Sequence, residues 1–408
     1  HQTPGSPPSS PPGTPLGSTD IAIVGGGVIG SAIAYFLASD PGFSGRVTVI
    51  ERDPTYARAS TPLSAGGIRQ QFSTPENIAI GKFGAAFLKQ VPDLLEVEGD
   101  RPDIHFVEGG YLFLASEAGR PILERNHATQ RAEGVEGTVL LEPDDLVRRF
   151  PWLSLEGLAL GCLGVRDEGW FDPFTLLQAF KRKARSLGVA YLKDEVTGIE
   201  RNGGRITALT LREGGRLACG TMVNAAGAQA GRVAALAGIA LPVAPRKRFV
   251  YVFDCRTPIE PLAPLTIDPS GVYFRPEGKG FIGGVSPPED RDPDSDDLEV
   301  EYDLFEETVW PALAARVPAF EAIKLTGAWA GHYDYNIVDQ NGIVGRHPEV
   351  ANLIFANGFS GHGLQQSPAV GRAVAELILQ GGYRSIDLTR FGYERFARDE
   401  PILELNVV

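Results

Sequence analysis

Glycines at a spacing that can bring backbone N–H groups against a phosphate lie near the start of the chain. Gly25-Gly26-Gly27-Val28-Ile29-Gly30 satisfies G-x-G-x-x-G directly after the apolar run 21–24. In this pattern Gly25 permits a tight turn, Gly27 lets the backbone approach a pyrophosphate, and Gly30 lets the following helix pack closely on the strand. The helix N-terminus offers free N–H groups and a partial positive charge. The segment therefore predicts a dinucleotide site.

A second copy of the same pattern lies in a different context. Gly278-Lys279-Gly280-Phe281-Ile282-Gly283 follows Arg275-Pro276-Glu277 and continues into Ser286-Pro287-Pro288. A helix cannot open on such a sequence, because each proline removes a backbone donor and restricts its neighbour. We expect this copy to form a hairpin turn between two strands.

The elements around the first copy complete a βαβ unit. Residues 21–24 are typical of a buried parallel strand, 28–39 of an amphipathic helix and 46–50 of a second strand. Glu51 follows that strand, 26 residues after Gly25, where its carboxylate can accept from a ribose hydroxyl. NAD and FAD both use this arrangement. The next loop, 60–67, is rich in small residues and can lie flat against a planar ring; the alternative is a plain surface loop.

The rest of the chain changes from an α/β pattern of helices and strands to a β-rich pattern and back again. Residues 174–186 and 368–379 predict helices, and 190–192, 196–200, 206–211 and 353–356 predict strands. Between them, 242–284 carries short β-like runs separated by Pro, Gly and Asp, which indicates an antiparallel insert. We interpret the acidic stretch 289–297 as a solvated loop. The first nineteen residues include six Pro and predict a disordered tail.

Several later strings resemble one family of flavoenzymes, the D-amino-acid oxidase and sarcosine/glycine oxidase superfamily. They are Gly169-Trp170-Phe171-Asp172-Pro173, Val223-Asn224-Ala225-Ala226-Gly227, Tyr273-Phe274-Arg275-Pro276 and Gly358-Phe359-Ser360-Gly361-His362-Gly363. The likeness runs from Asp20 to about Gly382. More narrowly, 64–73, 329–336 and 339–342 are similar to the subgroup called FAD-dependent oxidoreductase domain-containing protein.

The resemblance implies an α/β fold of two domains with FAD as cofactor. A Rossmann-like FAD-binding domain would comprise 20–90, 150–245 and 325–408. A discontinuous antiparallel β-sheet domain for the substrate would comprise 91–149 and 246–324, with 1–19 as the Pro-rich tail.

The resemblance also assigns residues to the cofactor. Val196 would contact adenine through its backbone, and 361–365 would give N–H groups to the flavin pyrimidine edge, before a helix that Pro368 opens. The full set of expected cofactor contacts is Gly25, Gly27, Val28, Ile29, Gly30, Glu51, Arg52, Ser60, Ser64, Ala65, Gly66, Gly67, Val196, Ala226, Gly227, Gly331, Gly358, Phe359, Gly361, His362, Gly363, Leu364 and Gln365.

The chemistry implied is oxidation of the C–N bond of an amino acid or secondary amine to an imine, with hydride passing to flavin N5. A buried substrate carboxylate needs a cationic or hydroxyl anchor. Tyr273 matches the family's carboxylate tyrosine, and Arg69 and Arg275 are the cationic candidates, with a solvated surface charge as the alternative for each. His332 is the nominated active-site histidine, whereas His362 is expected to brace backbone.

Departures from the family bear on flavin attachment and on the electron acceptor. The covalent attachment points of relatives correspond to His332 and Ser64 here, so we expect non-covalent FAD; a link to His332 is the alternative. Two family lysines correspond to Phe281 and Gln365. Loss of these cations leaves oxygen, a quinone or a protein carrier open as acceptor.

Composition narrows the function classes further. The 51 acidic residues exceed the 38 basic ones, giving a formal charge of −13, which disfavours nucleic acid as a partner. No apolar run reaches the roughly 18 residues of a membrane helix, and three scattered cysteines fit a reducing, cytoplasmic compartment. Two other classes stay open: a flavoprotein with an assembly or binding role in respiratory-complex biogenesis, and an NAD-dependent dehydrogenase.

Overall fold

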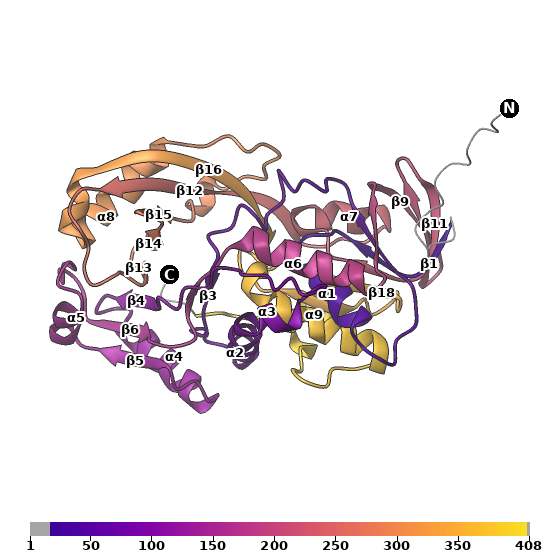
Figure 1. The fold of residues 1–408 in the computed structure, drawn as a ribbon, viewed down its shortest axis with the longest axis horizontal. Helices are drawn as coiled ribbons and strands as arrows, with labels where there is room; N and C mark the ends of the chain where they lie inside the picture. The colour runs from indigo at the N-terminus through magenta and orange to yellow at the C-terminus, as the bar shows by residue number, and fades with distance from the viewer. Residues whose placement is uncertain (1–16, 406–408) are drawn as a thin grey trace.

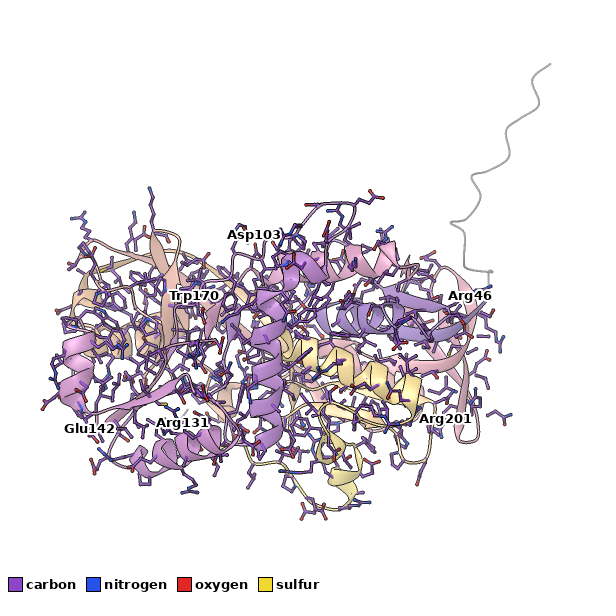
Figure 2. The ribbon with its side chains drawn as sticks, turned by 60° about the horizontal axis from the view of Figure 1, so that its bottom comes forward. Arg46, Asp103, Arg131, Glu142, Trp170 and Arg201 are labelled. Carbon is purple, nitrogen blue, oxygen red and sulfur yellow. The ribbon has the colours of Figure 1, made fainter. Side chains whose placement is uncertain are left out.

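The computed structural model describes residues 17–405, so the first sixteen residues of the tail predicted for 1–19 lie outside the described residues. Two eight-stranded sheets make up the molecule, each with its own helices (Figure 1). Figure 2 shows Arg131 and Glu142, beside the second sheet, at the opposite end of the molecule from Arg46 and Arg201 of the first. None of the helices described is long and apolar enough to cross a bilayer.

The predicted βαβ unit is present. Strand β1 (Ser18–Val24), helix α1 (Val28–Ala38) and strand β2 (Val47–Glu51) follow in order, and β1 pairs with β2 in parallel. Strand β1 begins before Asp20, inside the range expected to be a tail. The reason is that Ser18 and Thr19 pair with β11, and the buried Thr19 hydroxyl is hydrogen-bonded to Thr48 at 2.9 Å.

The first sheet has the order β17-β18-β11-β1-β2-β8, with β10 and β9 continuing from β11. Its central strands are parallel, and β17, β10 and β9 are antiparallel additions. The remaining bounds are β8 (Ala190–Lys193), β9 (Val196–Asn202), β10 (Arg205–Leu211), β11 (Gly215–Asn224), β17 (Ile343–Arg346) and β18 (Leu353–Asn357).

Helices cover both faces of this sheet. Helices α1, α2 (Pro75–Lys89), α6 (Pro173–Ser186) and α9 (Gly363–Gln380) share one core, whereas α7 (Ala230–Leu236) packs in the other (Figure 1). Helices α1 and α9 approach closely at Gly371, where a Cβ atom would lie 2.9 Å from the backbone of Ala32. Because β1 and β18 both run parallel to β11, the helices that follow them, α1 and α9, begin at the same edge of the sheet. Helices α3 (Val91–Leu94) and α10 (Glu394–Ala397) are short additions.

Helix α9 begins five residues earlier than Pro368, which the sequence suggested as its first residue. Pro368 lacks the N–H group that would reach the carbonyl of Leu364. The hydroxyl of Ser367 donates to that carbonyl instead, at 2.8 Å. Because this side chain replaces the missing donor, the helix extends back to Gly363 and its positive end lies at the glycine-rich segment.

The second sheet has the order β16-β12-β15-β14-β13-β4-β6-β5. Every neighbouring pair is antiparallel except β13 with β4. The hairpin β14–β15 contains the second glycine pattern in its turn, which confirms that prediction. The strands of the second sheet are β4 (Tyr111–Ala115), β5 (Thr138–Leu141), β6 (Leu160–Gly164), β12 (Val243–Cys255), β13 (Leu265–Ile267), β14 (Tyr273–Glu277), β15 (Gly280–Gly284) and β16 (Ile323–Asn336). The helices around this sheet are α4 (Arg120–Ala132), α5 (Pro143–Arg149) and α8 (Trp310–Arg316).

Two strands of the second sheet come from ranges that the sequence grouped with the cofactor domain. Strand β6 lies within 150–245 and pairs with β4 and β5, and most of β16 lies within 325–408 and pairs along its length with β12. Local texture does not show this, because sheet membership depends on which distant strand offers free hydrogen-bonding groups. Strands β3 (Gly67–Ile68) and β7 (Gly169–Trp170) form a small two-stranded sheet. In the sequence, each of them stands between a strand of one large sheet and a strand of the other.

Candidate functional site

A cavity of about 760 Å³ is lined by residues of both large sheets. Glu51 and Val196 line it where β2 and β9 of the first sheet meet it, whereas Ile267 and Tyr273 line it on β13 and β14 of the second. Sites for cofactors and small molecules commonly occupy about 300–1,000 Å³, and often at domain interfaces. The cavity therefore has the size and place of a combined cofactor and substrate site.

The glycine turn lies at the first-sheet end of the cavity. Gly25 has φ +102°, and a Cβ atom there would lie 2.2 Å from the carbonyl oxygen of Ala225. A Cβ atom on Gly30 would lie 1.9 Å from the oxygen of Gly25, so helix and turn pack too closely for any side chain. Glu51 braces the turn, since its carboxylate accepts from the N–H groups of Gly26 (3.1 Å) and Asp53 (2.8 Å). Burial raises the pKa of Glu51, against these two hydrogen bonds.

The small-residue loop 60–67 is held in place from the second sheet. The carbonyl oxygen of Ala65 accepts from Nε and Nη2 of Arg275, at 3.0 and 2.7 Å. The hydroxyl of Ser60 donates to the carbonyl of His332. Gly66, at φ +80°, passes so close to Phe171 that a Cβ atom would lie 2.4 Å from its carbonyl oxygen. The loop is thus a fixed wall of the cavity and not a plain surface loop.

Strand β16 holds the glycine-rich segment 358–363. The carboxylate of Asp334 accepts from the N–H group of Phe359 at 3.1 Å, and the Asp334 carbonyl accepts from Ser360. Gly361 has φ +98° and lies against the ring of Tyr333. A Cβ atom on Gly361 would lie 2.5 Å from Cζ of that ring. Burial raises the pKa of Asp334 to about 6. The first residues of α9, 363–365, line the cavity beyond this segment.

Arg69 projects into the cavity as a buried cation. It is 7% exposed, forms no ion pair within the part of the chain described, and its Nε atom has no hydrogen-bond partner. Its guanidinium carbon lies 4.4 Å from the ring centre of Phe72 and 5.0 Å from that of Phe113. Burial lowers the pKa of Arg69, but a guanidinium stays charged in proteins. Arg69 therefore places a positive charge at the cavity wall that is in direct contact with no carboxylate of residues 17–405.

The hydrogen-bond partner of Arg69 is an uncharged histidine. Nη2 of Arg69 lies 3.3 Å from Nε2 of His362. Burial and then the charge of Arg69 lower the pKa of His362 to about 3, so the imidazole is neutral and accepts. His362 thus supports the guanidinium, where the sequence suggested that it braces backbone. Gln365 holds the same segment, because its Oε1 atom accepts from the N–H group of Arg69 at 3.0 Å.

Three tyrosines line the cavity beside this cation: Tyr111 on β4, Tyr273 on β14 and Tyr333 on β16. Burial raises the pKa of each phenol, that of Tyr111 to about 12, so all three stay protonated near neutrality and can donate hydrogen bonds. Leu265 and Ile267 add apolar surface. The arrangement suits a small molecule with one anionic end.

The structure separates the other two catalytic candidates from this group. Arg275 is buried, but its guanidinium is bound to Ala65 and Glu277 and does not line the cavity. His332 lines the cavity, yet its Nε2 atom lies 2.8 Å from the carbonyl oxygen of Asp297. Since neighbouring side chains on a strand point to opposite faces, His332 points away from the face of Tyr333. Arg69 and Gln365 are in direct contact and Tyr273 lines the same cavity; Arg275 and His332 are not part of that group.

The acidic stretch expected to be a solvated loop is instead held against the protein. We call residues 292–297 the acidic segment. Arg248 binds Asp292 through two hydrogen bonds of 2.8 and 2.9 Å, and Asp292 is buried. Further ion pairs join Arg246 to Asp294 (2.9 Å), Lys247 to Asp297 (2.6 Å) and Arg232 to Asp296 (2.7 Å). The three consecutive cations 246–248 were the sequence signal that could have indicated this.

Most of the residues that the family resemblance assigns to the cofactor line the cavity. The cavity wall includes Gly25, Gly27, Val28, Ile29, Glu51, Arg52, Ser60, Ser64, Ala65, Gly66, Gly67, Val196, Ala226, Gly227, Gly331, Phe359, Gly361, His362, Gly363, Leu364 and Gln365, whereas Gly30 and Gly358 lie behind it. Residues that the sequence did not single out also line it, namely Tyr111, Arg248, Tyr333 and Asp334. Asp334 and Tyr333 fall inside a family string and Arg248 belongs to the run of cations 246–248, but Tyr111 carries no local signal.

Comparison with known proteins agrees with this geometry. A family model described as DAO, FAD dependent oxidoreductase, matches residues 20–377. FAD-dependent oxidoreductase domain-containing protein 1 of Xenopus laevis is 51% identical over 95% of this chain and 85% of its own length. Glycine oxidase of Geobacillus kaustophilus is 30% identical over 92% of this chain and 97% of its own length. The crystal structure of L-proline dehydrogenase from P. horikoshii superposes with a TM-score of 0.83 at 29% identity, covering 95% of this chain and all of that one.

Asp292→Asn removes the charge that pairs with Arg248 and leaves that guanidinium buried without an anionic partner. We expect the free energy of unfolding to fall by about 3–5 kcal/mol, measured by denaturant titration. Asp294→Asn is the matched control, because Asp294 is exposed and its pair should contribute less than about 1 kcal/mol. Equal losses in the two variants would contradict the assignment of Asp292 as the anchor of the acidic segment.

Proposed function

We propose, from the premise that this chain belongs to the DAO family of FAD-dependent oxidoreductases, that it oxidises the C–N bond of an amino acid or secondary amine carrying a carboxylate. The imine product would then hydrolyse. Relatives named glycine oxidase, sarcosine dehydrogenase and L-proline dehydrogenase support this class of reaction. FAD supplies the redox chemistry when bound, by accepting the hydride that leaves the substrate carbon.

The residues around the cavity fit FAD on the structure's own evidence. The close contacts at Gly25 and Gly30 leave no room for side chains in the turn, and Gly25 and Gly27 line the cavity. The N–H groups of Gly363, Leu364 and Gln365 make no hydrogen bond among residues 17–405, and all three residues line the cavity. Helix N-termini of this kind bind negative charge. The N-terminus of α1 would face the pyrophosphate, and the N-terminus of α9 would face the flavin edge that becomes electron-rich on reduction.

The observation that carries the substrate proposal is the buried, unpaired Arg69. An ion pair in the interior that lacks one partner costs about 3–5 kcal/mol, a penalty that a bound carboxylate would offset. The planar guanidinium can hold a carboxylate through two hydrogen bonds. Tyr273 lines the same cavity and its phenol is protonated, so its hydroxyl would donate a further one.

The other cavity walls would then place the reacting carbon. Tyr111 and Tyr333 flank Arg69, and Leu265 and Ile267 exclude water from the apolar part of the substrate. Hydride transfer requires the amine to be neutral, because an ammonium group has no lone pair to donate. The fixed position of Arg69, held through His362 and Gln365, sets the distance from carboxylate to reacting carbon.

Anaerobic mixing of the purified protein with amino acids, N-methyl amino acids and imino acids tests this function. One of them should bleach the flavin absorbance. Arg69→Met should raise the KM for that substrate roughly 30- to 5,000-fold, from the 2–5 kcal/mol of a buried charge pair. The same amine without its carboxylate is the control, since its oxidation should not depend on Arg69. If no compound bleaches the flavin, a binding or assembly role is favoured; colourless protein would instead favour NAD.

We propose non-covalent attachment of FAD. The two attachment positions of covalent relatives correspond to Ser64, which cannot form the histidyl link, and His332, whose ring is engaged with the carbonyl of Asp297. Acid precipitation of the holoprotein should therefore leave all yellow colour in the supernatant. Colour retained in the pellet, and lost from it in His332→Asn, would identify His332 as the attachment point.

We propose a dye-reducible dehydrogenase with a quinone or protein carrier as acceptor, not a fast oxidase. Gln365 stands where relatives have a lysine, and Phe281 is buried in β15 and does not line the cavity. A fixed cation near the flavin would stabilise developing superoxide, and Arg69 is committed to the substrate carboxylate. Stopped-flow mixing of reduced protein with oxygen should give reoxidation well below turnover with an artificial quinone. A rate equal to turnover would show an oxidase.

A further inference from the structure

Glu168 is a buried carboxylate without a cationic partner, on the segment between β6 and β7. Its side chain is inaccessible to solvent, and it forms no ion pair with any residue between 17 and 405. Its Oε2 atom accepts from the N–H group of Gln70 at 2.7 Å, and Oε1 accepts from Nε2 of Gln71 at 2.8 Å. Both partners directly follow Arg69 in the chain.

Strand β6 leaves room for this carboxylate. A Cβ atom on Gly164 would lie 1.9 Å from Oε1 of Glu168, so the strand admits the carboxylate only because residue 164 is glycine. The carbonyl of Glu168 accepts from Gly110 at 2.9 Å, and Nε2 of Gln71 also donates to the carbonyl of Tyr111 at 3.2 Å. Glu168 therefore joins the segment that carries Arg69 to the strand that carries Tyr111.

We propose that Glu168 is a positioning residue and the internal counter-charge of Arg69, and that it takes up a proton when a carboxylate substrate binds Arg69. The inference rests on the proposed function of Arg69 as the substrate anchor. With the cavity empty, the negative charges of buried Glu168 and half-buried Glu404 both favour the charged form of Arg69, although neither touches it, and Glu168 is the fully buried one of the two. A bound carboxylate would leave one net negative charge in the interior, and a proton from solvent on Glu168 removes it.

The pH range follows from the surroundings of Glu168. Burial raises the pKa of Glu168 to about 7, against hydrogen bonds from Gln71 and Gln70 and the charge of Arg69. Its other titratable neighbours are Tyr111 and Cys162; burial raises the pKa of both, that of Tyr111 to about 12. Neither they nor the guanidinium of Arg69 change protonation between pH 6 and 9. Anion affinity should therefore fall above about pH 7, where each binding event must bring in a proton. Asp334, which lines the same cavity and whose pKa burial raises to about 6, titrates below that range.

The test uses the FAD-loaded protein and benzoate, a carboxylate that cannot be oxidised at a C–N bond. The change in flavin absorbance on binding gives Kd from pH 6 to 9. In the unmodified protein we expect Kd to rise up to about tenfold per pH unit above pH 7. Glu168→Gln, which keeps the shape but cannot take up a proton, should give a Kd that does not vary between about pH 7 and 9. Glu108→Gln, at an exposed acid nearby, is the matched control and should retain the slope.

A second measurement does not depend on any variant. Titration calorimetry of the unmodified holoprotein at pH 8, in two buffers of different ionisation enthalpy, should show uptake approaching one proton per benzoate bound. Binding without proton uptake, or a Glu168→Gln variant that weakens binding equally at every pH and keeps the slope, would overturn the inference and leave Arg69 as the anchor. Absence of benzoate binding, or binding unchanged in Arg69→Met, would overturn the anchor and the inference together.

Discussion

A guanidinium group held in the interior without a carboxylate beside it is the constraint around which the cavity is organised. Arg69 stays charged at any ordinary pH, so the protein can support it only by indirect means. These are aromatic rings, a neutral imidazole from His362 and a more distant negative charge at Glu168. Each of these comes from a different element. The site therefore exists only when β3, β4, the β6–β7 segment and α9 are all in place.

Both sheets also contribute to the cofactor end of the cavity. The first sheet provides the glycine turn, but the second sheet holds the two segments that would face the flavin. Arg275 on β14 fixes the small-residue loop through Ala65, and Asp334 on β16 fixes the glycine-rich segment through Phe359. An arginine that appeared suited to binding substrate is thus used to hold a backbone. A side chain's chemistry alone does not distinguish these two uses.

What the sequence predicted well depends on short-range rules. The unit β1–α1–β2, the roles of Gly25 and Gly30 and the hairpin at Gly278 all follow from neighbouring residues. The sequence favours Arg69 over Arg275 only slightly, through its place beside the small-residue loop, since the full distinction depends on which distant strand each faces. His332 was nominated without knowing that strand alternation turns it from Tyr333 toward the acidic segment. Tyr111 was missed because β4 becomes part of the wall only by pairing with β13, about 150 residues later in the chain.

The pairing of distant strands has a consequence for how the protein is made. Strand β11 obtains its neighbour β18 only after residue 353 has been synthesised, and β12 obtains its long partner β16 only after residue 323. Both large sheets therefore remain incomplete on the ribosome until the last quarter of the chain has been synthesised. Pairings with such wide sequence separation fold slowly and leave apolar strand edges exposed in the meantime. Nascent chains of this protein should therefore depend on chaperones until late in translation, and the flavin site should be among the last features to form.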